Sequence, residues 1–281
     1  MDLFEEVAKI RATRRLYARM MRDEFGAKDP RSMALTISAH TLGLTMTAQQ
    51  PINNVARGAI QAVALAMAGV QAMEISTFDE AYRTPSEEAH MVGLRTQQIV
   101  QEESNVTQVA DPLGGSYFVE SLTNELETRI WEMVQDIEAR GDTEELVEQG
   151  YFRQIFTDAM ERLSRNVNDG TVVRVGVNSH AIPEDEDHLL KDTAETKIEP
   201  SRQRVDWMRD FKRGRDQEQV RKDLGALHDA GRDHDRNLMQ PFLAAMETGA
   251  TAGEMAGFLR QAYGLAYDPF GHETSPLETR A

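Results

Sequence analysis

The sequence predicts an α/β fold, part of a TIM-type (β/α)8 barrel, followed by a mostly helical region. Up to residue 141, short apolar stretches of strand length alternate with longer stretches in which apolar residues recur at three- and four-residue steps. Strands and helices that alternate with short connections are typical of a parallel sheet covered by helices. From residue 142 onward the pattern is mainly helical. We therefore expect two domains, 1–141 and 142–281.

The first domain is expected to open with a helix over 3–25. Leu3 and Val7 begin an apolar stripe with Arg and Glu residues between its members, and Gly26 follows as a stop signal. The next stretch, 33–39, is short and largely apolar, which suits a strand that is buried on both faces.

The rest of the first domain continues this alternation. Pro51 suits the first turn of a helix, and Ser86 is a candidate N-cap for another. In chain order, we expect a helix over 51–68, a strand over 72–76, a helix over 86–102, an extended stretch over 108–111 and a helix over 117–139.

Three parallel strands do not close a barrel. A complete barrel of this type needs eight strands and about 250 residues. The open edges and apolar faces of three strands would be exposed to water. We therefore expect the remaining strands to come from another polypeptide.

The second domain is expected to be helical with one further strand. The stretch 183–199 is acidic and is expected to be a loop. Before this loop, we expect a helix over 143–165 and a strand over 171–178. After it, we expect helices over about 200–230, 237–247 and 251–263.

Composition excludes several classes of function. The chain has 281 residues, of which 40% are hydrophobic, and a formal charge of −16, which argues against nucleic acid or an anionic membrane as partner. It has no cysteine, so disulfides and thiolate chemistry are excluded. No apolar run reaches the roughly 20 residues of a membrane span, and the acidic N-terminus lacks the features of a signal peptide. We expect a cytoplasmic protein. Its acid-rich, Lys-poor composition fits salt adaptation and a GC-rich genome equally well.

Several motifs along the chain occur together in a fixed order. They are Phe25-Gly26-Ala27-Lys28-Asp29-Pro30-Arg31-Ser32-Met33, Thr47-Ala48-Gln49-Gln50-Pro51 with Asn53-Asn54, Phe78-Asp79-Glu80-Ala81, Leu94-Arg95-Thr96-Gln97-Gln98, Asp111-Pro112-Leu113-Gly114-Gly115-Ser116-Tyr117, Val175-Gly176-Val177-Asn178 and Asn237-Leu238-Met239 with Pro241. In this order and spacing they resemble the large subunit of the methylmalonyl-CoA mutase family. The resemblance covers roughly 1–267, and the Gln-Gln-Pro and Arg-Thr-Gln-Gln forms are most similar to the isobutyryl-CoA and hydroxyisobutyryl-CoA branch.

This resemblance implies a subunit of an adenosylcobalamin-dependent acyl-CoA mutase that catalyses a radical 1,2 carbon-skeleton rearrangement. It implies that the chain supplies the last three βα units of the barrel. The N-terminal half of the barrel is then expected on one partner chain and the cobalamin on a small cobalamin-binding subunit, so the enzyme is active only as a complex. The family's Asp-x-His-x-x-Gly cobalamin motif is absent, and Met1 lies near a natural break, so a split gene is expected.

By resemblance, Glu80 matches a glutamate that contacts the adenosyl ribose, and a carboxylate suits that task because it accepts hydrogen bonds from two hydroxyls. A turn cap or a solvent-exposed side chain is the structural alternative. Ser76 replaces a family asparagine and is also assigned to the cofactor. His40 replaces a glutamine between adenosyl group and substrate, where its imidazole can titrate near neutral pH. It is assigned to catalysis and cofactor binding, with a satisfied core histidine as the alternative.

The substrate-binding candidates are Gln71, Ser38, Glu74 and Asn53. Gln71 matches a glutamine that contacts the CoA portion, and Asn53 opens a helix that faces the site in relatives. The structural alternative for Asn53 is an ordinary polar residue at a helix N-terminus. Ser38 and Glu74 each replace a family histidine, so the pocket gains a carboxylate, and methylmalonyl-CoA itself is not the expected substrate. The remaining histidines show no metal-ligand spacing.

Two other hypotheses remain open. The loss of Arg, His and Asn side chains at the strand ends is compatible with a diverged, non-catalytic paralogue that stabilises or assembles a mutase. A small binding domain that folds alone is disfavoured by the open strand edges.

Overall fold

Capping residues set the ends of the helices in this chain. We describe residues 2–195 and 201–276 of a computed structural model. Asp2 accepts the backbone N–H groups of Phe4 and Glu5, and so starts the first helix. The chain forms two compact units, Met1–Ile198 and Glu199–Ala281, and each is described by itself. The predicted end of the barrel part at residue 141 stays a prediction.

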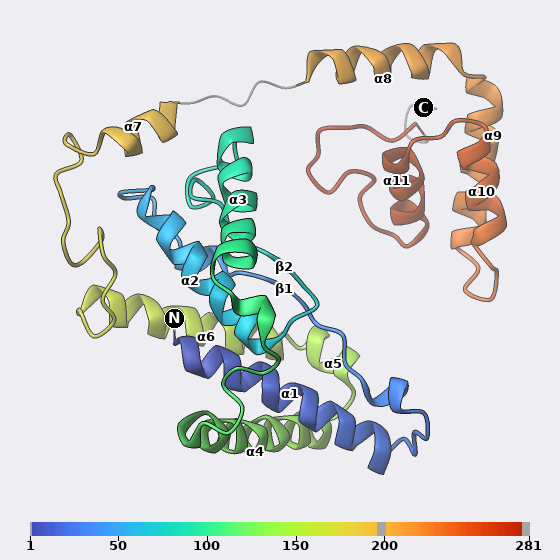
Figure 1. Ribbon diagram of the computed structural model, residues 1–281. Coiled ribbons are helices and arrows are strands. Elements are labelled where there is room, and N and C mark those ends of the chain that lie inside the picture. The colour runs from blue at the N-terminus through green and yellow to red at the C-terminus, as the bar shows by residue number, and fades with distance from the viewer. Residues whose placement is uncertain (1, 196–200, 277–281) are drawn as a thin grey trace. The chain divides into compact units, whose positions relative to one another are not determined.

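The first unit combines helices with a short parallel sheet (Figure 1). Single 3-10 turns cover Pro30–Met33, Gly43–Thr45 and Val106–Gln108. The regular elements are α1 (Leu3–Asp23), β1 (Ser38–His40), α2 (Asn53–Ala68), β2 (Ala72–Glu74), α3 (Glu87–Glu103), α4 (Tyr117–Arg140), α5 (Thr143–Glu148), α6 (Tyr151–Asn168) and α7 (His188–Glu195).

The sheet of the described residues pairs β1 with β2 in parallel, with Ser38 opposite Ala72 and His40 opposite Glu74. These four side chains share one face of the sheet, and all are exposed. Met73 points to the other face and packs against the apolar cluster of α2, α3 and β2. Helices therefore cover one face of this sheet, and the described residues of the first unit leave the side chains of the other face exposed.

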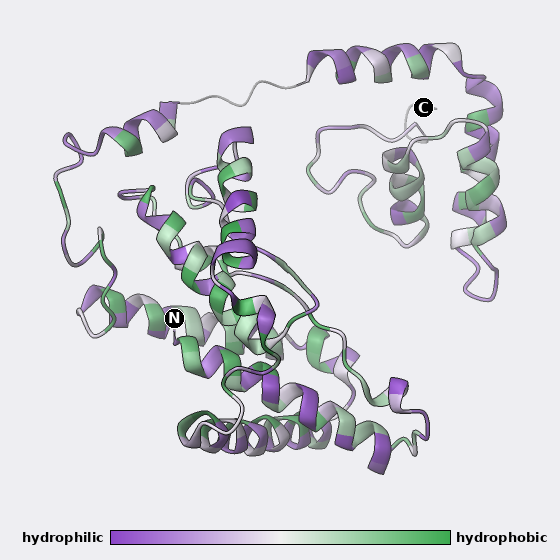
Figure 2. Cartoon of the chain, viewed as in Figure 1, coloured by the Kyte–Doolittle hydropathy of each residue, from purple (hydrophilic) through white to green (hydrophobic). Residues whose placement is uncertain are grey.

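Apolar contacts join the helices of the first unit. Val7 of α1 packs against Ala64 and Ala68 of α2, while Ala62 of α2 packs with Ile75 and Val100. Figure 2 shows α2 as a largely hydrophobic helix, in keeping with its position between α1 and α3. The small residues of α2 allow its neighbours to approach closely.

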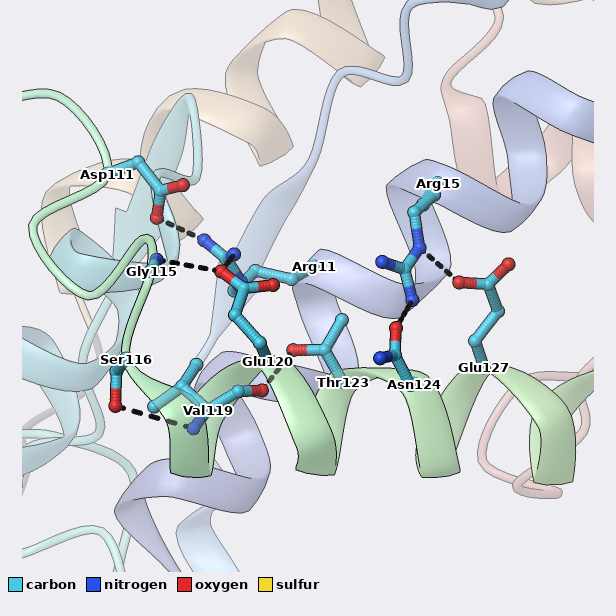
Figure 3. A network of polar contacts seen from close by, with 10 residues as sticks. All are labelled: Arg11, Arg15, Asp111, Gly115, Ser116, Val119, Glu120, Thr123, Asn124 and Glu127. Atoms are coloured by element: carbon cyan, nitrogen blue, oxygen red, sulfur yellow. Dashed lines mark hydrogen bonds and ion pairs between the residues drawn. The ribbon is translucent and has the colours of Figure 1, made fainter.

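Arginines of α1 anchor α4 and the loop before it (Figure 3). Arg11 bonds Asp111 and Glu120, and Glu120 also accepts the backbone N–H of Gly115 at 2.9 Å. One turn further along α1 and two turns further along α4, Arg15 bonds the buried Glu127. These contacts fix the end of the expected third βα unit against the first helix.

The predicted third strand is wrong. Residues 106–108 form a 3-10 turn, and the chain then bends through Asp111, which has a left-handed φ of 46°. A strand needs a neighbour that satisfies its backbone groups, and here the Asp111 backbone carbonyl instead accepts the N–H of Gly114. An α/β arrangement with a parallel strand pair is confirmed, and a three-stranded partial barrel is not seen.

The predicted strand over 171–178 is also wrong. The stretch is a compact turn with an isolated bridge between Val175 and Ser179. The Asn178 side-chain amide donates to the carbonyls of Val167 and Val172, and its oxygen accepts the N–H of Arg174. This one side chain satisfies backbone groups that a neighbouring strand would otherwise bind.

Helix boundaries account for the other differences. The expected helix over 143–165 breaks at Gly150 into α5 and α6. The expected loop over 183–199 contains α7, because Asp187 accepts the N–H of Leu190 and caps that helix. Residues 196–199 of that expected loop, and residue 200 of the following helix, lie outside the described residues.

The second unit is helical and has its own core. Its helices are α8 (Arg202–Gly214), α9 (Gln217–Gly231), α10 (Met239–Glu247) and α11 (Ala252–Ala262). Leu227 and Phe258 are fully buried in an apolar cluster of α9, α10 and α11. Asp216 caps α9, so the single helix expected over 200–230 is divided into α8 and α9. Figure 2 shows α8 as a mainly hydrophilic helix.

Candidate functional site

The carboxyl ends of β1 and β2 open into a pocket of about 500 Å³. His40 and Glu74 end the two strands as register partners on the exposed face. Together with Glu80 they line this pocket, so the structure brings together three of the predicted site residues. The other lining residues are Ile75, Thr77, Arg83, Thr84, Pro85, His90, Gly93, Leu94 and Gln97.

Glu80 lies at the end of a tight turn that follows β2. Its Oε2 accepts the backbone N–H of Thr77 at 3.2 Å. Its Oε1 lies so close to Gly43 that a Cβ at position 43 would be 2.5 Å away. A side chain at position 43 would therefore displace the Glu80 carboxylate from its present position. Among the described residues, no donor bonds Oε1, so this half-buried carboxylate has an oxygen to offer a ligand.

The neighbouring Asp79 holds the turn that carries Glu80. It is 2% exposed, and it accepts the Thr77 hydroxyl at 2.8 Å and the Ser86 backbone N–H at 2.9 Å. The guanidinium of Arg83 lies 4.0 Å from it. A buried carboxylate is costly unless hydrogen-bonded, and here those bonds make the turn rigid. The Phe78-Asp79-Glu80 motif thus contains one residue that shapes the turn and one that faces the pocket.

Ser76 is buried beneath the pocket. Its backbone N–H donates to the Thr41 hydroxyl at 2.7 Å, and its own hydroxyl donates to the Thr41 carbonyl at 2.9 Å. These two bonds tie together the segments that leave β1 and β2. The structure gives Ser76 a structural task, and its assignment to the cofactor stays a prediction.

Gln71 lies at the opposite end of the sheet, just before β2. Its Oε1 accepts the backbone N–H of Ile37 at 2.8 Å, and its Nε2 donates to the Gly69 carbonyl at 3.1 Å. Gln71 therefore aligns the starts of the two strands. The structure does not bring it to the pocket of His40 and Glu80.

Ser38 and Asn53 also lie apart from the residues that line the pocket. Ser38 is exposed on the same face of β1 as His40, two residues toward the strand's start. Asn53 opens α2 and donates to the Gln50 side-chain oxygen at 3.0 Å. Both assignments to the substrate stay predictions.

Sequence reasoning did not assign the polar pocket residues Arg83, His90 and Gln97 to the site, nor the threonines Thr77 and Thr84. His90, Leu94 and Gln97 recur at the four- and three-residue steps of one helix face on α3. That spacing was the available signal for His90 and Gln97. Arg83 is 13% exposed beside Asp79, and only the folded turn shows its position.

The donor set fits a sugar or amide ligand better than a metal. The described residues contain no group of three or more His, Cys, Asp or Glu side chains arranged to hold a metal ion. The free Glu80 oxygen and the exposed His40 imidazole suit hydroxyl and amide groups. The residues present therefore fit the ribose of an adenosyl group. Every helix in the described part of the chain is too short or too polar to traverse a lipid bilayer.

A pocket built at the carboxyl ends of parallel strands is the usual ligand site of α/β proteins, and this chain is of that class. Residues 1–265 match the family model of methylmalonyl-CoA mutase, so the chain belongs to the methylmalonyl-CoA mutase family.

Curated relatives agree with this family. The chain is 37% identical over 269 residues to the 2-hydroxyisobutanoyl-CoA mutase large subunit of Aquincola tertiaricarbonis, which covers 94% of this chain and 46% of that protein. It is 34% identical over 266 residues to methylmalonyl-CoA mutase of Rhizobium meliloti, covering 94% and 37%. It is also 34% identical over 265 residues to methylmalonyl-CoA mutase of Escherichia coli, covering 94% and 36%. The chain thus spans less than half the length of each of these relatives.

Proposed function

We propose that this chain is a subunit of an adenosylcobalamin-dependent acyl-CoA mutase that interconverts branched and linear acyl-CoA thioesters in the cytoplasm. The observation that carries the proposal is the pocket at the carboxyl ends of β1 and β2. This pocket brings together His40, Glu74 and Glu80, and the chain that forms it belongs to the methylmalonyl-CoA mutase family.

The exposed face of the β1–β2 sheet supports the proposal that partner chains complete the fold. Ser38, His40 and Glu74 are exposed on one face of the sheet among the residues described for this unit. A parallel sheet is ordinarily covered on both faces. We propose that the chain provides the last βα units of a barrel, that a second chain provides the N-terminal half, and that a small subunit carries the cobalamin.

The residues of this chain would bind and orient rather than break bonds. When bound, adenosylcobalamin would supply the radical that removes a hydrogen atom from the substrate. Glu80 would accept hydrogen bonds from the ribose hydroxyls through its free oxygen. His40 would orient the ribose or the acyl group, and the closed barrel would exclude water from the pocket.

The charge of the pocket supports a particular kind of acyl group. Among the described residues that line it, Glu74 and Glu80 supply two carboxylates and Arg83 supplies a guanidinium. Arg83 lies beside the buried Asp79. A second carboxylate on the acyl group would be repelled. We therefore propose a monocarboxylic acyl-CoA as substrate.

Reconstitution tests the proposed activity. The chain would be combined with a chain bearing the N-terminal half of the barrel and a cobalamin-binding subunit, then supplied with adenosylcobalamin and a panel of acyl-CoAs. We expect isomerised product and a radical signal in electron paramagnetic resonance. No turnover and no radical signal with any acyl-CoA would reject the enzyme.

A non-catalytic role is the second candidate. It is favoured by Ser76 and Gln71, whose polar groups bond the backbone of the sheet rather than the pocket. In this role the chain would stabilise or assemble a mutase. It predicts that His40→Ala leaves the turnover of the complex unchanged, whereas the enzyme hypothesis predicts a clear loss.

A further inference from the structure

The segment after α6 lies against the connection between β1 and α2. The backbone N–H of Gln50 donates to Asp187 Oδ2 at 2.6 Å, and the Gln50 side-chain amide donates to the His180 carbonyl at 3.0 Å. The Arg57 guanidinium donates to the Val175 carbonyl at 2.7 Å. These contacts join residues more than 110 positions apart, so they are tertiary rather than local.

Asp187 is the most deeply buried group in these contacts, with 5% of its surface exposed. One carboxylate oxygen accepts the N–H of Gln50, and the other accepts the N–H of Leu190 at 3.1 Å, which starts α7. A buried carboxylate persists only where hydrogen bonds replace its water. The single side chain therefore couples the start of α7 to the β1–α2 connection.

Gln50 adopts a conformation that needs this support. Its φ is 48°, in the left-handed region that non-glycine residues rarely occupy. Such a conformation is unfavourable and persists where surrounding contacts enforce it. Its side-chain oxygen in turn accepts the amide of Asn53, one of the predicted substrate-binding residues.

From this connection, hydrogen bonds lead to the turn that carries Glu80. The buried Asn54 donates both to the Thr47 carbonyl and to the Phe78 carbonyl at 2.8 Å, and its oxygen accepts the Thr47 N–H at 3.0 Å. Phe78 lies two residues before Glu80. Gly43, on the same connection, packs directly against the Glu80 carboxylate. A shift of the connection would therefore displace Glu80.

We infer that Asp187 is a positioning residue: it fixes the connection 41–52, and through it the Glu80 carboxylate, although it does not line the pocket itself. The effect of Asp187 on the position of this connection is independent of the proposed function. Its effect on ligand binding rests on the proposed function.

Hydrogen–deuterium exchange of the full chain tests the structural part. In Asp187→Ala, we expect amides in 41–54 and 77–80 to exchange at least about tenfold faster, with Gln50 as the direct probe. Exchange in α1 and α4 should be unchanged. The matched control is Asp185→Ala, an exposed residue of the same segment, which should exchange like the wild type. Asp187→Asn keeps one acceptor oxygen and should be intermediate. Wild-type exchange over 41–54 in Asp187→Ala, or equally faster exchange in α1 and α4, would overturn the inference.

The reconstituted mutase tests the functional part. Asp187→Ala should raise the half-saturating adenosylcobalamin concentration roughly tenfold with a smaller change in kcat, and Asp187→Asn should recover part of the loss. An unchanged half-saturation would overturn the link to Glu80. If the wild-type complex shows no mutase activity, the proposed function fails, while the exchange experiment still decides whether Asp187 holds the connection.

Discussion

The polar atoms of each candidate residue determine whether it can serve a ligand. Glu80 uses one oxygen in its own turn and keeps the other free, whereas the hydroxyl of Ser76 is bonded to the Thr41 backbone. Sequence reasoning assigned both residues to cofactor binding. It could not show that one has a bonded side chain and the other an available oxygen, because this difference arises from how the ends of β1 and β2 meet.

Replacing Glu80 by Gln should weaken cofactor binding without unfolding the chain. The amide oxygen cannot replace a charged acceptor, and the loss of one charge-assisted hydrogen bond of about 1.5 kcal/mol corresponds to roughly tenfold in affinity. The measurement is the half-saturating adenosylcobalamin concentration of the reconstituted complex. Glu87→Gln, an exposed residue at the start of α3, is the control. An equal half-saturating adenosylcobalamin concentration in the Glu80 and Glu87 variants would show that Glu80 does not bind the cofactor.

Replacing Glu74 by Gln should change substrate preference. Removing one negative charge from the pocket lowers its repulsion of a dicarboxylic acyl group. We expect kcat/KM for a dicarboxylic acyl-CoA to rise about tenfold relative to a monocarboxylic one. Competition assays with the two thioesters measure this ratio directly. An unchanged ratio would mean that Glu74 does not face the acyl group.

At the scale of the elements, the packing of α1 on α4 depends on a buried carboxylate. Glu127 accepts bonds from Arg15 and Arg19 while its side chain is only 7% exposed. Sequence periodicity predicted both helices, and the caps Ser86 and Ser116 set the starts of α3 and α4. Periodicity could not show this pairing, because the partners lie more than 100 residues apart.

Glu127→Ala should destabilise the first unit by about 2–3 kcal/mol, since it leaves two arginines without their shared partner. Urea unfolding followed by circular dichroism measures the loss. Glu125→Ala removes an exposed pair with Arg129 and should cost no more than about 0.5 kcal/mol. Similar losses of unfolding free energy in the two variants would show that the buried Glu127 contributes no more stability than an exposed ion pair.

The second unit contains a carboxylate with a shifted pKa. Burial would raise the pKa of Glu254, but hydrogen bonds from Arg215 and Thr251 outweigh it and lower the pKa from 4.5 to about 2. A lowered pKa in the folded state stabilises the fold above the unfolded value of 4.5. This contribution is lost as pH falls toward about 2.

Glu254→Gln should therefore destabilise the second unit by at most about 3 kcal/mol at pH 7, because one pKa unit is worth about 1.4 kcal/mol. The difference from wild type should shrink as pH falls from about 4.5 toward 2. Urea titrations of the full chain with Trp131 replaced by Phe, so that Trp207 in α8 is the remaining tryptophan, provide the measurement by fluorescence across this range. A difference that stays constant with pH would contradict the lowered pKa.

At the scale of the whole molecule, the described residues contain two paired strands, where the sequence predicted three in 1–141 and a fourth over 171–178. Strand length and apolar character predicted two strands here, but β1 covers Ser38–His40 where 33–39 was expected, and β2 covers Ala72–Glu74 where 72–76 was expected. The stretch 108–111 has the same character, yet it lacks a strand neighbour and binds α1 through Asp111 instead. A strand depends on partners that a single sequence does not specify, and α7 was missed because its acidic sequence was typical of a loop.

The central claim is that the open face of β1 and β2 is completed by the N-terminal half of a barrel on another chain. The most direct test is hydrogen–deuterium exchange of residues 36–42 and 71–77, with and without a chain that carries the first five barrel strands. We predict a stable complex in which the amides of these segments that lack a partner among the described residues exchange at least about tenfold more slowly, because strands of the second chain would pair with the outer edges of β1 and β2. No complex, and identical exchange in both samples, would contradict it.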